Sequence, residues 1–352
     1  MWLRLSRYIV TESFWLYLFG VAAFCLLLSI DYLSVWARFF IEQDASFQSI
    51  GKLMLFQSPW FLHMAMPIAA VFAVLLASGR LAKDSELKAA YSLGVPPYRL
   101  LFPLLGFALL VSLLALINNG FLEPKAEALY QKEVNLFYSD RPPTEMQLDV
   151  SYALENGIYY AGRMRSNPDN RHQADLSGIL VVQEDGTRIS AQSGTWDSDQ
   201  KTWTLYDARL IYGDGLRERH DSYSLNFDLA GTVENNIIDN EKLTLGQLWQ
   251  RWREESRAAK NTRDIAFEFH RRIADAFSAF IFVLVAATLG LHLRGRNIAF
   301  AWTIILLVLF YFMWTLSGDL FEKQVLSAFS AAWLTSGVVG VIGLILAFWR
   351  LR

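Results

Sequence analysis

Residues 97–119 read PYRLLFPLLGFALLVSLLALINN, a stretch in which Arg99 is the only charged residue. About twenty predominantly apolar residues are enough to cross roughly 30 Å of hydrocarbon as a helix. Such a stretch indicates a membrane protein, because backbone polar groups inside lipid have to bond within their own helix. Stretches of the same character cover residues 9–31, 60–82, 270–292, 298–320 and 327–349. The sequence therefore predicts six membrane-spanning helices in two groups of three.

The composition agrees with this class and excludes others. Of the 352 residues 53% are hydrophobic, and they gather toward the two ends of the chain, which is typical of a membrane protein. The formal net charge is only -2, so no basic field favours a nucleic-acid partner. The single cysteine, Cys25, lies in an apolar run, which excludes a disulfide framework and a cysteine-based metal site.

The lysines and arginines predict the orientation of the spans, because cytoplasmic loops retain positive charge. One side carries Arg4, Arg7, Arg80, Lys83, Lys88, Arg99, Arg294, Arg296, Arg350 and Arg352. The opposite short loops carry little more than Arg38, Lys52 and Lys323. We therefore expect both termini in the cytoplasm and the long middle segment in the periplasm. The first span is longer than a signal-peptide core, so we expect it to be a retained anchor.

The middle segment, residues 125–265, has the alternating apolar pattern of half-buried strands. The alternation covers Gln147–Leu154, Gly157–Met164, Ser177–Gln183, Thr202–Tyr212 and Ser222–Leu229. Turn-forming clusters separate these runs, which predicts an antiparallel sandwich or a jelly-roll-like all-β domain of about 100 residues. The predicted domains are residues 1–124, with three spans, residues 125–265, and residues 266–352, with three more.

A charged stretch, Gln247–Arg263, leads from the β domain back to the membrane. Leu248, Trp249 and Trp252 lie at helical spacing within it and form an apolar stripe. We therefore expect an amphipathic connector helix at the membrane face.

The cytoplasmic segment between the second and third spans predicts a short helix over about residues 84–94. Asp84 or Ser85 can cap its first turn, Glu86 suits its positive end, and Gly94 ends it. Leu87, Ala90 and Tyr91 fall on one face. Such a helix can insert into a groove of another protein, or it can lie on lipid headgroups as an ordinary loop helix.

At this segment the chain resembles the LptF/LptG permeases of the lipopolysaccharide export ABC transporter. The resemblance is carried by residues 78–87 (SGRLAKDSEL) with Gly94, by Met66-Pro67, by residues 191–196 (AQSGTW) and 203–205 (WTL), and by residues 269–274 (FHRRIA). These motifs keep the family's order over essentially the whole chain. The sequence departs from the family's pattern at Asp275-Ala276, where an apolar residue and a proline are usual, and this leaves the local bend and polarity of the fourth span in question.

The resemblance implies a location in the bacterial inner membrane and a set of partners. These are an ATPase dimer of the LptB type, the paired LptF or LptG permease, a periplasmic bridge of LptC and LptA type, lipopolysaccharide and membrane lipid. Glu86 is implied to meet a basic residue of the ATPase, with Asp84, Leu87, Ala90, Tyr91 and Gly94 beside it. The chain has no GxxxxGK[ST] motif, so we expect ATP and Mg²⁺ to be bound by the partner and no cofactor by this chain.

A phosphorylated glycolipid needs cationic side chains near the periplasmic membrane surface, where guanidinium groups can bind phosphate oxygens. Arg38, Lys52, Arg271 and Arg272 are placed for this. The alternative for each is a side chain that reaches to the interface or forms an internal ion pair.

An enzyme is the less favoured alternative. Asp31, Asp275 and Asp319 lie near the expected periplasmic ends of spans, whereas an intramembrane aspartyl enzyme needs two carboxylates that face each other. SxxK occurs at Ser49 and at Ser85, among other chance matches, and HExxH and GxSxG do not occur. The candidate metal ligands His63, His270 and His292 lie on different segments, which argues against a metal site.

Two other transport or scaffold readings stay open at this point. A mechanically coupled ABC exporter for lipoprotein usually places its large domain after the first of four spans, whereas this chain places it after the third of six. A passive scaffold would not explain the short cytoplasmic helix.

Gly337, Gly340 and Gly343 place small residues along the sixth span. They can let another helix approach this span closely, or they can face lipid.

Overall fold

The computed structural model describes residues 2–42, 45–140, 146–154, 156–167, 170, 172–213, 215–227, 240–291 and 296–350. They form two compact units. The helical unit comprises Met1–Leu33, Leu55–Glu127 and Asp239–Arg352, and the sheet unit comprises Ser34–Met54 and Ala128–Ile238.

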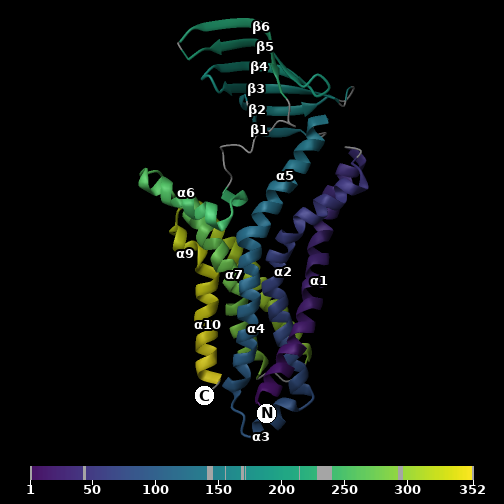
Figure 1. The fold of residues 1–352 in the computed structure, drawn as a ribbon, viewed down its shortest axis with the longest axis vertical. Coiled ribbons are helices and arrows are strands. Elements are labelled where there is room, and N and C mark those ends of the chain that lie inside the picture. The colour runs from purple at the N-terminus through teal and green to yellow at the C-terminus, as the bar shows by residue number, and fades with distance from the viewer. Residues whose placement is uncertain are drawn as a thin grey trace. The chain divides into compact units, whose positions relative to one another are not determined.

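Long helices dominate the chain outside the sheet (Figure 1). They are α1 (Trp2–Glu42), α2 (Phe47–Lys83), α3 (Glu86–Ser92), α4 (Pro97–Ile117), the π-helical turn η1 (Asn118–Leu122), α5 (Glu123–Asp140), the 3-10 turn η3 (Asn240–Lys242), α6 (Leu245–Arg257), α7 (Arg263–Gly290), α8 (Arg296–Glu322), α9 (Ala328–Ala332) and α10 (Leu334–Arg350). The predicted connector helix is α6. It begins two residues earlier than Gln247, because Thr244 and Gln247 form a capping box at its start, and it ends at Arg257.

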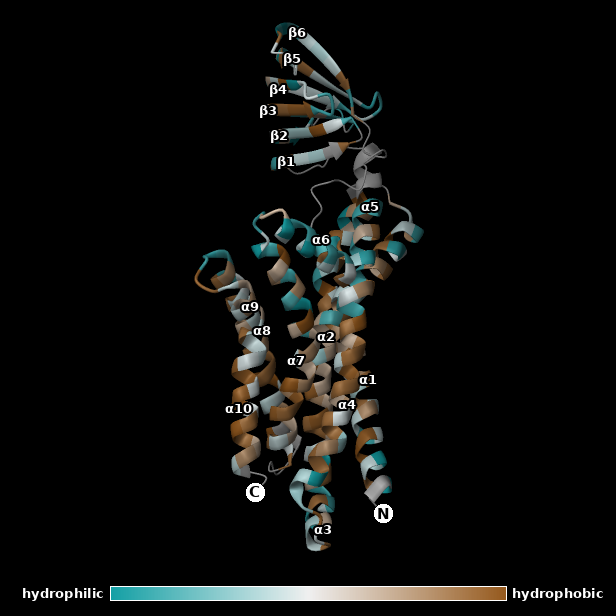
Figure 2. Ribbon diagram, turned by 60° about the vertical axis from the view of Figure 1, so that its left-hand side comes forward, coloured by the Kyte–Doolittle hydropathy of each residue, from teal (hydrophilic) through white to brown (hydrophobic). Residues whose placement is uncertain are grey.

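Within the described residues, five helices are long and apolar enough to cross a membrane, which confirms five of the six predicted spans. Figure 2 shows the hydrophobic middle sections of these helices and the hydrophilic residues near their ends. The sixth predicted span is divided between α9 and α10, with a break at Trp333. Because α10 has 17 residues, it is about 25 Å long, and only together with α9 does it approach the thickness of the hydrocarbon.

Helix α7 lies at the centre of the helical unit and contacts α4, α6, α8, α9 and α10. Small residues allow some of these close contacts. A Cβ atom at Gly343 would lie 3.1 Å from Leu284 of α7, and one at Gly340 would lie 3.6 Å from Ile281. The predicted close approach along the sixth span is therefore confirmed at these two glycines, whereas Gly337 has no atom of the described residues within 4 Å of its Cβ position.

The N-terminal end of α1, the C-terminal end of α10 and α3 lie at one end of the helical unit (Figures 1 and 2). This arrangement is the one that the lysine and arginine distribution predicts for the termini and the short helix.

The sheet unit contains an antiparallel six-stranded sheet in the order β1-β2-β3-β4-β5-β6. The strands are β1 (Gln147–Leu154), β2 (Gly157–Ser166), β3 (Gln173–Gln183), β4 (Arg188–Asp197), β5 (Thr202–Ile211) and β6 (Arg217–Asn226). The all-β insertion is confirmed. Its described strands form a meander and not the Greek-key order of a jelly roll, because connections of two to six residues pair each strand with the next. The last predicted strand, Ser222–Leu229, overlaps β6, and its final residues 228 and 229 lie outside the described residues.

A crease crosses all six strands of the sheet. It consists of one residue from each strand, and these six residues lie opposite one another but outside the regular strand pairing. They are Asp149, Gly162, Gly178, Gln192, Asp207 and Asp221. Asp149 and Asp207 have φ angles of 53°. At the crease the buried positions change parity, for example from Trp203 and Leu205 to Ala208 in β5. The irregularity thus keeps the buried side chains of β2, β3, β4 and β5 on one face.

Aromatic rings form the core of this face. The ring centroids of Trp203 and Phe227 lie 4.5 Å apart, and those of Tyr159 and Trp196 lie 5.2 and 5.3 Å from Phe227. The Tyr159 hydroxyl donates to the Asn226 carbonyl at 2.9 Å, which satisfies its one polar group.

The contact between α2 and α7 gives a first prediction. A Cβ atom at Gly290 would lie 2.7 Å from the Cβ of Ser78. Gly290→Ala should therefore lower the free energy of unfolding by about 1–3 kcal/mol, because the helices have to separate. Gly106→Ala, mid-helix in α4 with open space at its Cβ position, should leave it unchanged or raise it by up to about 1 kcal/mol. Denaturation of the full chain in micelles measures both, and equal stability of the two variants would contradict the packing described.

Candidate functional site

The end of helix α3 follows the predicted signal, whereas its start does not. Ser85 is its N-cap residue with a φ of 61°, and its side chain makes no capping hydrogen bond within the described part of the chain, so the predicted capping by Asp84 or Ser85 is wrong. The left-handed turn at Ser85 lets the chain pass directly from α2 into α3. The predicted stop at Gly94 is confirmed: Gly94 has a φ of 77°, and its N–H and that of Val95 donate to the carbonyls of Tyr91 and Ala90.

The apolar side of α3 faces its own helical unit. Leu87 is 6% exposed and belongs to the same core cluster as residues of α1, α2, α4 and α7. Tyr91 packs against this core, and burial raises the pKa of its hydroxyl, which keeps it neutral. Ala90 is half-buried, whereas Leu93, 73% exposed, and Gly94 face outward with Asp84 and Lys88. Leu87 and Tyr91 thus anchor α3, and Leu93 is the exposed apolar residue that periodicity did not single out.

A chain of hydrogen bonds joins α3 to α1 and α2. The Tyr8 hydroxyl donates to Glu86 Oε1 at 3.1 Å, and Arg80 Nη2 donates to the Tyr8 oxygen at 2.7 Å. The second terminal nitrogen of Arg80 lies 2.8 Å from Glu12 Oε1. Glu86, the carboxylate expected to meet a partner, is therefore held in place by two neighbouring helices.

The four predicted cargo-binding cations have different surroundings. Arg38 is exposed, and Lys52, whose side chain is 47% exposed, pairs with Glu133 at 3.3 Å. Arg271 has 27% of its side chain exposed and lies 2.7 Å from Glu268. Arg272 is 5% exposed. The first two belong to the sheet unit and the last two to the helical unit.

Arg272 has its donors occupied within the chain. Its Nε donates to Glu268 at 2.7 Å, and its terminal nitrogens donate to the carbonyls of Asn240, Glu241 and Leu243. These bonds attach the segment before α6 to α7, so the contacts favour the internal ion pair over cargo binding for this residue.

The predicted intramembrane carboxylates also separate into two kinds. Asp31 and Asp319 are exposed, whereas Asp275 is buried at 7% exposure. Asp275 faces His63 of α2, and the other side of His63 faces Glu123 of α5. The two carboxylates are thus separated by an imidazole and do not form the facing pair that an aspartyl enzyme needs. Helix α7 runs without interruption through Asp275, so the helix does not break where the family pattern has proline.

Sequence reasoning treated His63 as one of several scattered histidines and did not include Glu123. The signal that could have found them is the cost of burying an ionisable residue in a span, which demands a partner for His63 as it does for Asp275. His270 packs against Trp252 and Phe329, and His292 lies outside the described residues.

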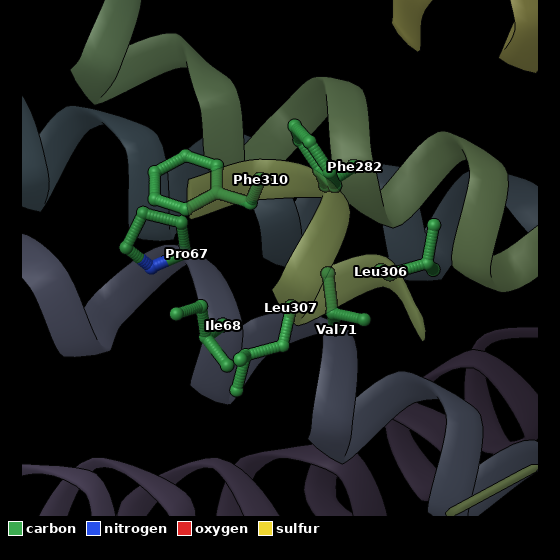
Figure 3. Close-up of a pocket in the computed structure, with 7 residues that line it drawn as sticks. All are labelled: Pro67, Ile68, Val71, Phe282, Leu306, Leu307 and Phe310. Atoms are coloured by element: carbon green, nitrogen blue, oxygen red, sulfur yellow. The ribbon is translucent and has the colours of Figure 1, made fainter. Parts of the chain in front are cut away.

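A small apolar cavity lies where α2, α7 and α8 meet. Figure 3 shows its lining residues: Pro67, Ile68 and Val71 of α2, Phe282 of α7, and Leu306, Leu307 and Phe310 of α8. Its volume is about 10 Å³, the lower limit for one water molecule, and all of its lining side chains are apolar, so it should stay dry. The cavity is far too small for a lipid and marks imperfect packing beside Pro67.

One family model matches the chain over residues 7–350, nearly its whole length. The model is described as lipopolysaccharide export system permease LptF/LptG. No curated protein sequence matches the chain.

The hydrogen bonds of Tyr8 give a second prediction. Tyr8→Phe should make the backbone amides of residues 86–93 exchange hydrogen about two- to five-fold faster, because losing these bonds costs about 0.5–1 kcal/mol of local stability. Tyr98→Phe is the matched control, since the described residues offer the Tyr98 hydroxyl no hydrogen bond. Hydrogen exchange read by mass spectrometry tests this, and equal exchange in the two variants would show that Tyr8 does not hold α3.

Proposed function

The chain belongs to the LptF/LptG family of lipopolysaccharide export permeases, and we propose that it is one permease half of an ABC exporter that extracts lipopolysaccharide from the outer leaflet of the bacterial inner membrane. It is a multi-pass membrane protein, and its family is one of non-catalytic transport subunits. The single observation that carries the proposal is α3, a short helix anchored in the bundle core at the end where the chain termini lie.

The energy enters in trans, from an ATPase dimer of the LptB type in the cytoplasm that binds ATP and Mg²⁺. Glu86 meets a basic residue in a groove of the ATPase, and Asp84, Ala90, Gly94 and Leu93 form the surface around it. Because Leu87 is buried in the core, a movement of α3 has to displace the helices against which it packs. The hydrogen bonds from Tyr8 transmit that movement to α1 and α2.

The cargo is an amphiphile with an anionic head. Arg38, Lys52 and Arg271 are the proposed contacts for its phosphates, since each has some of its side chain exposed. Lys52 would exchange Glu133 for a phosphate oxygen, while Arg272 keeps its internal partners.

The sheet unit is proposed to lie in the periplasm and to pass the cargo to a bridge of LptC and LptA type. Within the described strands, β1 and β6 each have one neighbour, so each leaves a free edge. A strand of another protein can add to such an edge by main-chain hydrogen bonds. The remaining partner, the paired LptF or LptG permease, completes the membrane part of the exporter.

An exporter for a different amphiphile, such as a lipoprotein, is the second candidate. The position of the inserted domain after the third apolar stretch and the family membership both favour lipopolysaccharide.

A third prediction follows for Glu86. In co-purification with the neighbouring permease and candidate ATPase, Glu86→Ala should weaken ATPase binding roughly tenfold, the loss expected for one charged hydrogen bond of about 1.5 kcal/mol. Glu254→Ala, which removes an exposed carboxylate from α6, should leave binding unchanged.

Glu86→Ala also removes the acceptor of the Tyr8 hydrogen bond, so Tyr8→Phe is the second control. Tyr8→Phe keeps the carboxylate and should retain most of the ATPase binding. If the wild-type chain is purified from this co-expression without any bound ATPase, the proposed coupling role of α3 is wrong.

A further inference from the structure

His63 lies between two carboxylates that come from other parts of the chain. Its Nδ1 is 2.9 Å from Glu123 Oε2 and 3.1 Å from Glu123 Oε1. Its Nε2 is 3.4 Å from Asp275 Oδ2, close enough for an ion pair although without hydrogen-bond alignment. Trp314 of α8 completes the group by donating from Nε1 to the same Asp275 oxygen at 3.2 Å.

The three side chains are shielded from solvent. The exposed fractions are 11% for the side chain of His63, 21% for that of Glu123 and 9% for that of Asp275. Glu123 is positioned by its local backbone. The π-helical turn η1 directly precedes Glu123, and Asn118 in that turn donates to the Pro59 carbonyl of α2 at 2.8 Å, which holds η1 against the helix of His63.

The surrounding charges require a cation at His63. Next to this group on α7, Glu268 pairs with both Arg271 and Arg272 at 2.7 Å. The guanidinium carbon of Arg271 lies 5.9 Å from the centre of the Trp314 ring, whose Nε1 donates to Asp275. Glu123, Glu268 and Asp275 are three carboxylates, whereas the two arginines supply two positive charges. A neutral His63 would leave one negative charge uncompensated in a mostly buried cluster, which costs several kcal/mol.

The hydrogen-bonding chemistry leads to the same conclusion. An ionised carboxylate only accepts hydrogen bonds, so an imidazole nitrogen facing one needs its own hydrogen. Nδ1 needs a hydrogen to bond to Glu123, and an unprotonated Nε2 would point its lone pair toward the Asp275 oxygen 3.4 Å away. Only the imidazolium, which carries a hydrogen on both nitrogens, is attracted to both carboxylates. Metal binding is the other use of such side chains, but no group of three or more in the described part of the chain is arranged to hold a metal ion.

We propose that His63 is a proton-binding site that joins the two membrane halves, its imidazolium holding α2 to Glu123 of α5 and to Asp275 of α7. The ligand is one proton, taken from water and released to it. The titratable groups that act on His63 are Glu123 and Asp275, with Arg271 and Glu268 behind Asp275, and α8 contributes the non-titratable Trp314. Loss of the proton leaves Glu123 and Asp275 buried without their shared cation, so the halves separate more easily at this point. The inference rests on this geometry alone and holds whichever amphiphile is exported.

The direct test is ¹⁵N NMR of the histidine-labelled full chain in lipid nanodiscs at about pH 8, where an exposed histidine with its usual pKa of about 6.5 is almost entirely neutral. We expect one of the five histidines to have both nitrogens protonated. Replacing each of the other four by glutamine assigns the signal to His63 even if His63→Gln does not fold. A neutral tautomer at His63 in the wild-type chain would overturn the proposal.

Two carboxamide variants sharpen the test. Asp275→Asn and Glu123→Gln each remove one negative charge and keep the shape, and each should move part or all of the His63 signal to a neutral form at that pH. His270, on α7 but packed against rings, supplies the comparison signal, which should stay unchanged in both variants. If His63 stays doubly protonated in both variants, its proton is not held by these carboxylates and the proposal fails.

Discussion

The helical unit depends on how α7 satisfies its charges. This helix is apolar enough to cross a membrane, yet it carries Glu268, Arg271, Arg272 and Asp275 within about two turns. Each would cost several kcal/mol if buried without a partner. Glu268 pairs with both arginines within α7, and the other partners come from elsewhere: main-chain carbonyls from the segment before α6 and the imidazole of α2. Because α4, α6, α8, α9 and α10 also contact α7, this pairing fixes the helix on which the others pack.

Helix α2 links the end that is proposed to lie in the cytoplasm and bind the ATPase with this charged region. Arg80 near its C-terminal end holds Tyr8 and Glu12, and His63 lies about 25 Å away along the same helix. Between them stands Pro67, which lacks the N–H that would bond to the carbonyl of His63. The cavity beside Pro67 means that this part of α2 is less tightly packed than its surroundings. Pro67 and its cavity thus lie between the end of α2 that contacts α3 and the charged cluster.

Much of the architecture could be predicted because it follows from local patterns. Long apolar runs identified five spans, the alternation identified most of the strands, and Gly94 identified the end of α3. The break at Trp333 was missed because the apolar run continues through it. The crease was missed because strands were found by the alternation of apolar and polar residues. At Gly162 and Asp207 this alternation shifts by one residue, so the pattern stops at the point where the crease lies. The orientation of α3 was missed because periodicity finds an apolar face without saying what covers it.

The charged cluster shows the same limit more strongly, because His63, Glu123 and Asp275 are far apart in the sequence and only the fold brings them together.

The proposal that this chain moves an amphiphile for an ATPase is tested most directly in proteoliposomes that contain it with its partner permease and ATPase. The account predicts that lipopolysaccharide leaves these membranes for a periplasmic acceptor only when ATP is hydrolysed, and that a lipoprotein in a parallel sample stays behind. ATP hydrolysis without any transfer of lipopolysaccharide, or transfer of the lipoprotein alone, would contradict it.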